Sequence, residues 1–227
     1  MSAIAATLFD LDGTLCQSDQ DAMTLYRGSF DVAGIDPFGE PGDLWRALDG
    51  PPDPGDELGY LTAGFSAVAA QYGRLEADAS ALARGFIETL DLTAVSFHPG
   101  AEEALELAGD HGLVGLVTNG PARRQAVKVD ALGIANAFDV IIYAGDLPRR
   151  KPHADPFDRA LAALGVDPDR VLHVGDSLEY DVAGAQAAGL LAAWYPHKSN
   201  PDPREYTPDF ILTHLSELEV VLTAPAD

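Results

Sequence analysis

The part of this 227-residue chain that follows residue 98 alternates short apolar runs with longer helical patterns, and no other feature restricts the fold as strongly. Short apolar runs bounded by turn residues favour buried strands, whereas apolar residues that recur on one helical face favour helices. The predicted strands cover residues 113–117, 140–143, 171–174, 191–194 and 210–212. The predicted helices cover residues 121–132, 155–164, 178–188 and 214–222. Strands that alternate with helices form a parallel sheet with helices on both faces.

One more strand-like run, Ile4 to Phe9, precedes this region and ends at the polar sequence DLDG. From Ser18 to about Phe97 the chain instead carries alanine, leucine and polar residues at helical spacing, and we expect no strand there. The predicted fold class is therefore α/β. A Rossmann-like parallel sheet comes from residues 1–15 and 98–227, and an all-helical domain over residues 16–97 is inserted after the first strand.

Charge is the unusual part of the composition: 36 acidic residues stand against 14 basic ones, a formal net charge of −22. The acidic residues are spread along the whole chain, which indicates a generally acidic surface. A nucleic acid polymer or an anionic membrane needs a basic patch on its partner, so we expect neither to bind. The charge also favours the hypothesis that the protein is adapted to a high-salt cytoplasm, where screening removes the self-repulsion.

Cysteine usage and the N-terminal residues predict a cytoplasmic protein. Cys16 is the single cysteine, so no intramolecular disulfide forms and a reducing compartment is expected. The first residues lack a basic start and reach Asp10 too soon for a secretory signal. No apolar run approaches the length of a membrane span.

Residues with the chemistry of a catalytic site stand in four loops, each after a predicted strand. They are Asp10 and Asp12 in DLDGT, Thr118 and Asn119 in TNG, Lys151 in KP, and Asp176 and Asp181 in GDSLEYD. Each motif taken alone is more often a turn, a helix cap or a solvated lysine. Parallel strands end at one edge of their sheet, where such folds form their sites, so we expect these residues to converge.

The combination of these residue types indicates a site for a metal ion and a phosphate group. Carboxylates gathered in one place repel one another unless a cation lies between them, and ligands that are all oxygen favour Mg²⁺. A lysine, a hydroxyl and the backbone N–H groups of a helix start complement a phosphate. The six histidines show no metal-ligand spacing, so we expect no zinc site, and His173 is interpreted as a packed strand residue.

The motifs DLDGTL, TNG, KP and GDSxxxD, in this order and spacing, resemble those of the haloacid dehalogenase superfamily of phosphohydrolases. The resemblance covers residues 1–15 and 98–227, while residues 16–97 match that family's helical cap only in place, length and helical character. The stretches VTNGPARRQAVKVDALGI and VGDSLEYDVAGAQAAGLLAAWY look closest to the branch that contains pyrimidine nucleotidase-like and N-acylneuraminate phosphatase-like enzymes.

The resemblance implies the roles of the two aspartates in the first motif. Asp10 would be the nucleophile that attacks phosphorus and forms an aspartyl-phosphate. Asp12 would be the general acid that protonates the leaving group and then the base that activates water. Two carboxylates so close are useful when a metal ion keeps one ionised while the other carries a proton.

The resemblance also implies the binding groups. The phosphoryl oxygens would be held by Thr118, Asn119 and Lys151. Three protein groups would bind Mg²⁺: the carboxylates of Asp10 and Asp176 and the backbone carbonyl of Asp12. Asp181 would lie behind these ligands or orient Lys151.

Hydrolysis of a small phosphomonoester is the first of several reactions that the resemblance leaves open. A phosphomutase needs cap residues that hold a sugar phosphate and exclude water, and no motif identifies them. A 2-haloacid dehalogenase is disfavoured, because the dehalogenases of this superfamily do not keep an acid at the position of Asp12. A non-enzymatic relative that binds a phospho-ligand would have lost a motif residue, and none is missing. The expected partner is a small phosphorylated metabolite such as a nucleoside monophosphate, phosphoglycolate or a sugar phosphate.

The charge hypothesis predicts that molar KCl raises the melting temperature of the protein. Salt screens the repulsion between acidic groups, which acts more strongly in the folded chain than in the expanded unfolded chain. Thermal denaturation followed by circular dichroism at low and at molar salt measures the effect. A melting temperature that does not rise would contradict the hypothesis.

Overall fold

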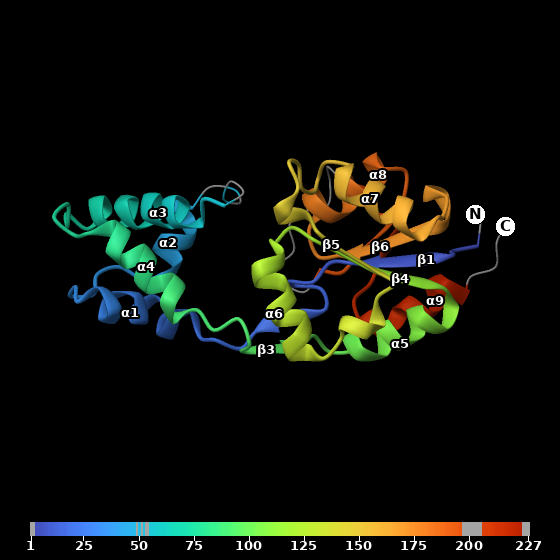
Figure 1. Ribbon diagram of the computed structural model, residues 1–227, viewed down its shortest axis with the longest axis horizontal. Coiled ribbons are helices and arrows are strands. Elements are labelled where there is room, and N and C mark those ends of the chain that lie inside the picture. The colour runs from blue at the N-terminus through green and yellow to red at the C-terminus, as the bar shows by residue number, and fades with distance from the viewer. Residues whose placement is uncertain (1–2, 49, 51, 53–54, 197–205, 224–227) are drawn as a thin grey trace. The chain divides into compact units, whose positions relative to one another are not determined.

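The computed structural model describes residues 3–48, 50, 52, 55–196 and 206–223, and the chain divides into two compact units (Figure 1). The larger unit combines residues 1–17 with 95–227, and the smaller unit covers residues 18–94. The smaller unit therefore interrupts the larger one in sequence. That it acts as a cap over the site remains a prediction.

The larger unit contains a six-stranded sheet, built among the described residues in the order β5-β4-β1-β6-β7-β8. Its strands are β1 (Ala6–Phe9), β4 (Leu113–Thr118), β5 (Val140–Tyr143), β6 (Val171–Gly175), β7 (Leu191–Trp194) and β8 (Phe210–Ile211). Every neighbouring pair is parallel, and β1 lies between β4 and β6, with Ala6 opposite both Leu113 and Val171. The predicted strands and their parallel arrangement are confirmed.

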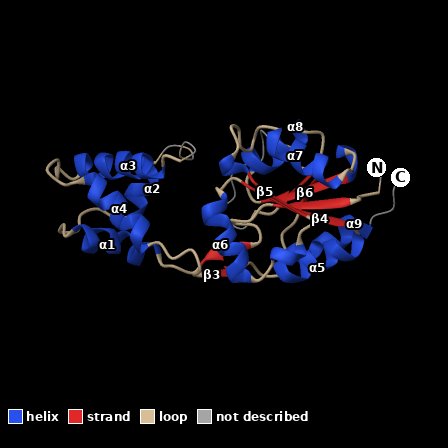
Figure 2. Ribbon diagram, viewed as in Figure 1, coloured by secondary structure: helices blue, strands red, loops and turns tan. Residues whose placement is uncertain are grey.

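Helices cover both faces of this sheet, with α7 and α8 on one face and α5 and α9 on the other (Figures 1 and 2). Their bounds, with α6, are α5 (Ala101–His111), α6 (Ala122–Leu132), α7 (Asp155–Leu164), α8 (Gly184–Ala187) and α9 (Leu218–Thr223). Successive residues of a strand point to opposite faces. Phe9 accordingly packs in one core cluster with α5 and α9, and Leu8 in the other with α7 and α8. The predicted α/β class is confirmed.

Two predicted helices are less regular than their sequence pattern. The segment predicted as one helix over 178–188 is a π-helical turn, Leu178–Ala183, followed by α8. A 3₁₀ turn, Leu215–Glu217, likewise precedes α9. Single π-helical turns occur often at functional sites, and this one carries Asp181.

The expectation of no strand between Ser18 and Phe97 is wrong at both ends of that range. The strand β3 (Val95–Phe97) pairs with β2 (Cys16–Ser18) in a small two-stranded sheet at the junction of the two units. Each strand has only three residues, which is too short to show an alternating pattern in sequence. Their pairing depends on segments that lie far apart along the chain, so periodicity gives no sign of it.

Apart from Ser18, the last residue of β2, the regular elements in the described part of the smaller unit are helices. They are α1 (Ala22–Ala33), α2 (Pro41–Ala47), α3 (Glu57–Gln71) and α4 (Ala79–Thr89). The unit has its own core, in which the ring of Phe65 lies against those of Tyr26 and Phe30. Asp21, Asp56 and Asp78 cap the starts of α1, α3 and α4 through their side chains. Of the helices in the described ranges, none is long and apolar enough to cross a membrane.

Candidate active site

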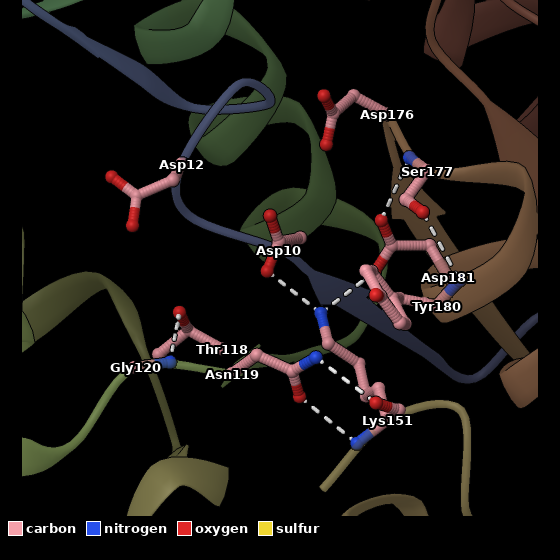
Figure 3. Close-up of a pocket in the computed structure, with 10 residues that line it drawn as sticks. All are labelled: Asp10, Asp12, Thr118, Asn119, Gly120, Lys151, Asp176, Ser177, Tyr180 and Asp181. Carbon is pink, nitrogen blue, oxygen red and sulfur yellow. Dashed lines mark hydrogen bonds and ion pairs between the residues drawn. The ribbon is translucent and has the colours of Figure 1, made fainter. Parts of the chain in front are cut away.

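The loops after β1, β4, β5 and β6 line one cavity of about 170 Å³ (Figure 3). These strands are neighbours and parallel, so their carboxyl ends lie side by side. The residues that line the cavity are Asp10, Asp12, Thr118, Asn119, Gly120, Lys151, Asp176, Ser177, Tyr180 and Asp181. The structure therefore brings together every residue that the sequence predicts for the site.

Lys151 lies at the centre of the site with a side chain that is only 2% exposed. Its Nζ atom donates hydrogen bonds to Oδ1 of Asp10 at 2.7 Å, to Oδ1 of Asp181 at 2.7 Å and to the carbonyl of Val117 at 2.8 Å. An ammonium group has three donors, so each of them has a partner. Burial of the charge is tolerated because it is paired and fully hydrogen-bonded.

The ionisation of these groups follows from burial and from their mutual charges. Burial favours the neutral form of Lys151, but the carboxylates of Asp10 and Asp181 outweigh it and raise the pKa of the lysine above its ordinary value. In Asp181, burial is outweighed by Lys151 and His173, which lower the pKa of the carboxyl group. In Asp10, burial outweighs the attraction of Lys151, and repulsion from Asp181 and Asp176 adds to it, so the pKa is raised to about 8. The single positive charge of Lys151 does not neutralise the negative charges of the clustered carboxylates.

The donor set of this cluster suits a hard divalent cation. Carboxylate oxygens of Asp10, Asp176 and Asp181 lie within 4.8 Å of one another, and ligands that are all oxygen favour Mg²⁺. Asp181 already accepts hydrogen bonds on both oxygens, from Lys151 at 2.7 Å and from the backbone N–H of Ser177 at 3.0 Å. Asp10 and Asp176 are therefore the better candidates for direct ligands. A cation beside Asp10 would also lower the pKa that burial raises.

Two residues of α6 that the sequence interpretation missed contact Asp12. Nζ of Lys128 lies 2.6 Å from Oδ1 of Asp12, and Nε2 of Gln125 donates to Oδ2 at 2.7 Å. Gln125 Nε2 also donates to Oγ1 of Thr118 at 2.7 Å. A signal was present, because residues at positions i and i+3 of a helix share a face and this helix follows the TNG motif.

The side-chain amide of Asn119 binds the backbone of Lys151 instead of facing the cavity. Its Nδ2 donates to the carbonyl of Lys151 at 3.0 Å, and the backbone N–H of Lys151 donates to its Oδ1 at 2.9 Å. This reciprocal pair joins the loop after β4 to the segment that carries Lys151 (Figure 3). A contact of Asn119 with a phosphoryl oxygen would therefore come from its backbone N–H.

His173 is a packed residue of β6, as expected, and it has a contact that the sequence did not indicate. It is buried, and its ring lies 5.0 Å from that of Phe157, edge to face. Its Nε2 lies 3.0 Å from Oδ1 of Asp181. Burial lowers the pKa of His173, so the ring is neutral and donates this hydrogen bond. His173 thereby fixes the carboxylate that in turn holds Lys151.

Gly145 sets how closely the loops after β4 and β5 approach each other. Its backbone N–H donates to the carbonyl of Gly120 at 3.3 Å. A Cβ atom at this position would overlap with the backbone of the loop after β4, at 2.6 Å from the carbonyl carbon of Gly120. The site loops therefore meet only because residue 145 has no side chain.

The family of the chain follows from comparison with known proteins. A family model of haloacid dehalogenase-like hydrolases matches residues 4–189. An N-acetylmuramic acid 6-phosphate phosphatase from Pseudomonas aeruginosa is 30% identical over 229 residues, which cover 96% of this chain and 95% of that protein. The chain belongs to the haloacid dehalogenase-like hydrolase family.

Other similar proteins differ in the fraction of their length that matches this chain. The pyrimidine 5'-nucleotidase YjjG of Escherichia coli is 33% identical over 125 residues, or 55% of this chain and 56% of that protein. The chain spans about half the length of the first curated relatives it matches. The magnesium-bound structure of the HAD-hydrolase YfnB from Bacillus subtilis has a TM-score of 0.76 at 25% identity and covers 98% of this chain and 100% of that one.

Replacement of Gly145 by alanine should destabilise the protein by about 1–3 kcal/mol, the usual cost of extra atoms in a packed region. The matched control is Gly109→Ala, because a Cβ atom there meets nothing within 4 Å and the residue lies in α5. The control should be neutral or stabilising by up to about 1 kcal/mol, as alanine is the better helix former. Urea unfolding measures both, and equal free energies of unfolding for the two variants would contradict the interpretation.

Proposed function

We propose that this chain is a Mg²⁺-dependent phosphatase that hydrolyses a small phosphomonoester through an aspartyl-phosphate on Asp10. The observation that carries the proposal is the buried contact between Lys151 and Asp10, in a cavity that Thr118 also lines. It fixes a carboxylate nucleophile beside groups that suit phosphoryl oxygens. Membership of a hydrolase family that contains phosphatases supports the same reaction.

In the first step the Asp10 carboxylate attacks phosphorus. A bond forms between an Asp10 oxygen and phosphorus, and the bond from phosphorus to the leaving oxygen breaks. The carboxyl group of Asp12 gives its proton to that oxygen, so the product leaves as an alcohol rather than as an alkoxide. Both carboxyl groups line the same cavity, as this step requires.

In the second step a water molecule attacks the phosphorus of the aspartyl-phosphate. The Asp12 carboxylate takes a proton from the water, and the bond between phosphorus and Asp10 breaks. Inorganic phosphate leaves, Asp10 is again a carboxylate and Asp12 is again protonated. The net reaction consumes one phosphomonoester and one water and yields one alcohol and one phosphate.

The remaining residues offset charge and hold the phosphoryl group. Lys151 and the Thr118 hydroxyl stabilise the negative charge that spreads over the phosphoryl oxygens in the transition state. Mg²⁺, held by Asp10, Asp176 and the backbone carbonyl of Asp12, would neutralise charge so that an anionic carboxylate approaches an anionic phosphate. Asp181 acts behind these groups by orienting Lys151.

The substrate is a small phosphorylated metabolite, and the relatives suggest where to look first. They include a nucleotidase and a phosphatase of a sugar 6-phosphate, so nucleoside monophosphates, sugar phosphates and phosphoglycolate are the first substrates to test in a panel of phosphorylated metabolites.

Two other reactions are distinguished by their products. A phosphomutase would interconvert sugar phosphates without releasing phosphate. A dehalogenase would release halide from a 2-haloacid, and Asp12 argues against it. A single cysteine suits a reaction in the reducing cytoplasm.

Replacement of Asp10 by asparagine should abolish phosphate release, because an amide is a far weaker nucleophile than a carboxylate. The matched control is Asp110→Asn, since Asp110 is exposed on α5 and lies outside the cavity. Phosphate release from the metabolite panel is measured with Mg²⁺, and circular dichroism checks the fold of each variant. Near-normal turnover by the Asp10 variant would disprove the mechanism.

Removal of divalent cations should abolish phosphatase activity reversibly. We expect phosphate release to stop in excess EDTA and to return when Mg²⁺ is added beyond the chelator, because the carboxylate cluster needs added positive charge. The melting temperature should rise with Mg²⁺, as a ligand that binds the folded state stabilises it. Activity that is indifferent to EDTA would remove the metal from the proposal.

A further inference from the structure

The Asp12 carboxylate is held by α6 at both of its oxygens. Nζ of Lys128 lies 2.6 Å from Oδ1, and Nε2 of Gln125 lies 2.7 Å from Oδ2. The Asp12 side chain is 50% exposed, whereas Lys128 is 12% exposed and Gln125 is buried. The partners are thus more firmly packed than the carboxylate they hold. Figure 3 shows this carboxylate turned away from Asp10.

Gln125 connects Asp12 to the Thr118 hydroxyl. Its amide nitrogen has two hydrogens, and the two acceptors within hydrogen-bond distance are Oδ2 of Asp12 and Oγ1 of Thr118, both at 2.7 Å. A hydroxyl that accepts from Gln125 has its own hydrogen left to donate to another group. In this cavity that group would be a phosphoryl oxygen.

Gly120 leaves the space that the side chain of Gln125 occupies. A Cβ atom on Gly120 would lie 2.7 Å from Nε2 of Gln125, closer than side chains approach. The glycine of the TNG motif is therefore needed for Gln125 to reach Thr118 and Asp12. The ion pair between Lys128 and Asp12 contributes little to the free energy of unfolding, because the Asp12 carboxylate is half exposed. A small displacement of Asp12 would, however, lower the rate of proton transfer strongly.

We propose that Gln125 and Lys128 are positioning residues that fix Asp12 for proton transfer to the leaving oxygen, with Gln125 also orienting the Thr118 hydroxyl toward the phosphate. The inference rests on the proposed phosphatase function of the same site. In the proposed steps neither residue bonds to phosphorus or gives or takes the transferred proton. Each acts by holding a group that does, so their loss displaces the proton donor and leaves the nucleophile in place.

The test compares two leaving groups in wild-type protein and in Lys128→Met. A simple alkyl phosphate such as glycerol 3-phosphate expels a strongly basic alkoxide and depends on a proton donor, whereas p-nitrophenyl phosphate expels a weakly basic phenolate and does not. We expect Lys128→Met to lower kcat for the alkyl phosphate by about tenfold or more, and kcat for p-nitrophenyl phosphate by less than about threefold. Lys128→Arg keeps the cation and should restore most of the loss.

Gln125→Met separates the two contacts of the glutamine. It should lower kcat for the alkyl phosphate, as Lys128→Met does, and in addition raise KM for both substrates, because the Thr118 hydroxyl loses its orientation. Arg159→Met is the matched control: Arg159 is exposed on α7 and lies outside the cavity, so the variant removes a positive charge without a change at the site. It should leave kcat for both substrates unchanged.

The outcomes distinguish the inference from the function on which it rests. Equal loss of kcat for both substrates in Lys128→Met would assign the lysine a purely structural role and overturn the inference. Faster turnover of the alkyl phosphate would also overturn it, since Lys128 would then withdraw Asp12 from the reaction. Wild-type protein that releases no phosphate from either substrate with Mg²⁺, or from the metabolite panel, would overturn the proposed function and the inference together.

Discussion

The rest of the site depends on the hydrogen bonds of one buried ammonium group. Lys151 links Asp10 at the end of β1, Asp181 in the π-helical turn after β6 and the carbonyl of Val117 in β4. Loss of one partner of a buried ion pair costs about 3–5 kcal/mol, because the other charge is left uncompensated. Segments that lie far apart in sequence are therefore held in one arrangement by the need to satisfy a single cation.

The same cluster explains why this edge of the sheet suits phosphoryl transfer. Asp10, Asp176 and Asp181 bring three carboxylates together, and Lys151 supplies one compensating charge. Burial and the remaining repulsion raise the pKa of Asp10 to about 8, which is unfavourable for a nucleophile until a cation is added. A divalent metal ion bound here would offset this excess of negative charge, and together with Lys151 it would attract an anionic substrate.

The sequence predicted the sheet well, because a buried parallel strand is a continuous apolar run between turn residues, as in Leu113–Thr118. It failed for β3, whose three residues carry no period. It did not predict that the side-chain amide of Asn119 binds the backbone of Lys151. It also passed over Gln125, although this residue shares a face of the helix after the TNG motif with Lys128. In each case the decisive partner is distant along the chain.

The sequence by itself determined the class of fold, the order of the motifs and the identity of the residues that gather at the strand ends. These follow from local periodicity and from the rule that parallel strands end at one edge of their sheet. Tertiary structure alone decided which group binds which: Asp181 to Lys151 and His173, and Asp12 to Lys128 and Gln125. A hydrogen bond forms only when donor and acceptor lie within a few tenths of an ångström of the preferred distance, and that distance is set only once the helices and strands have packed.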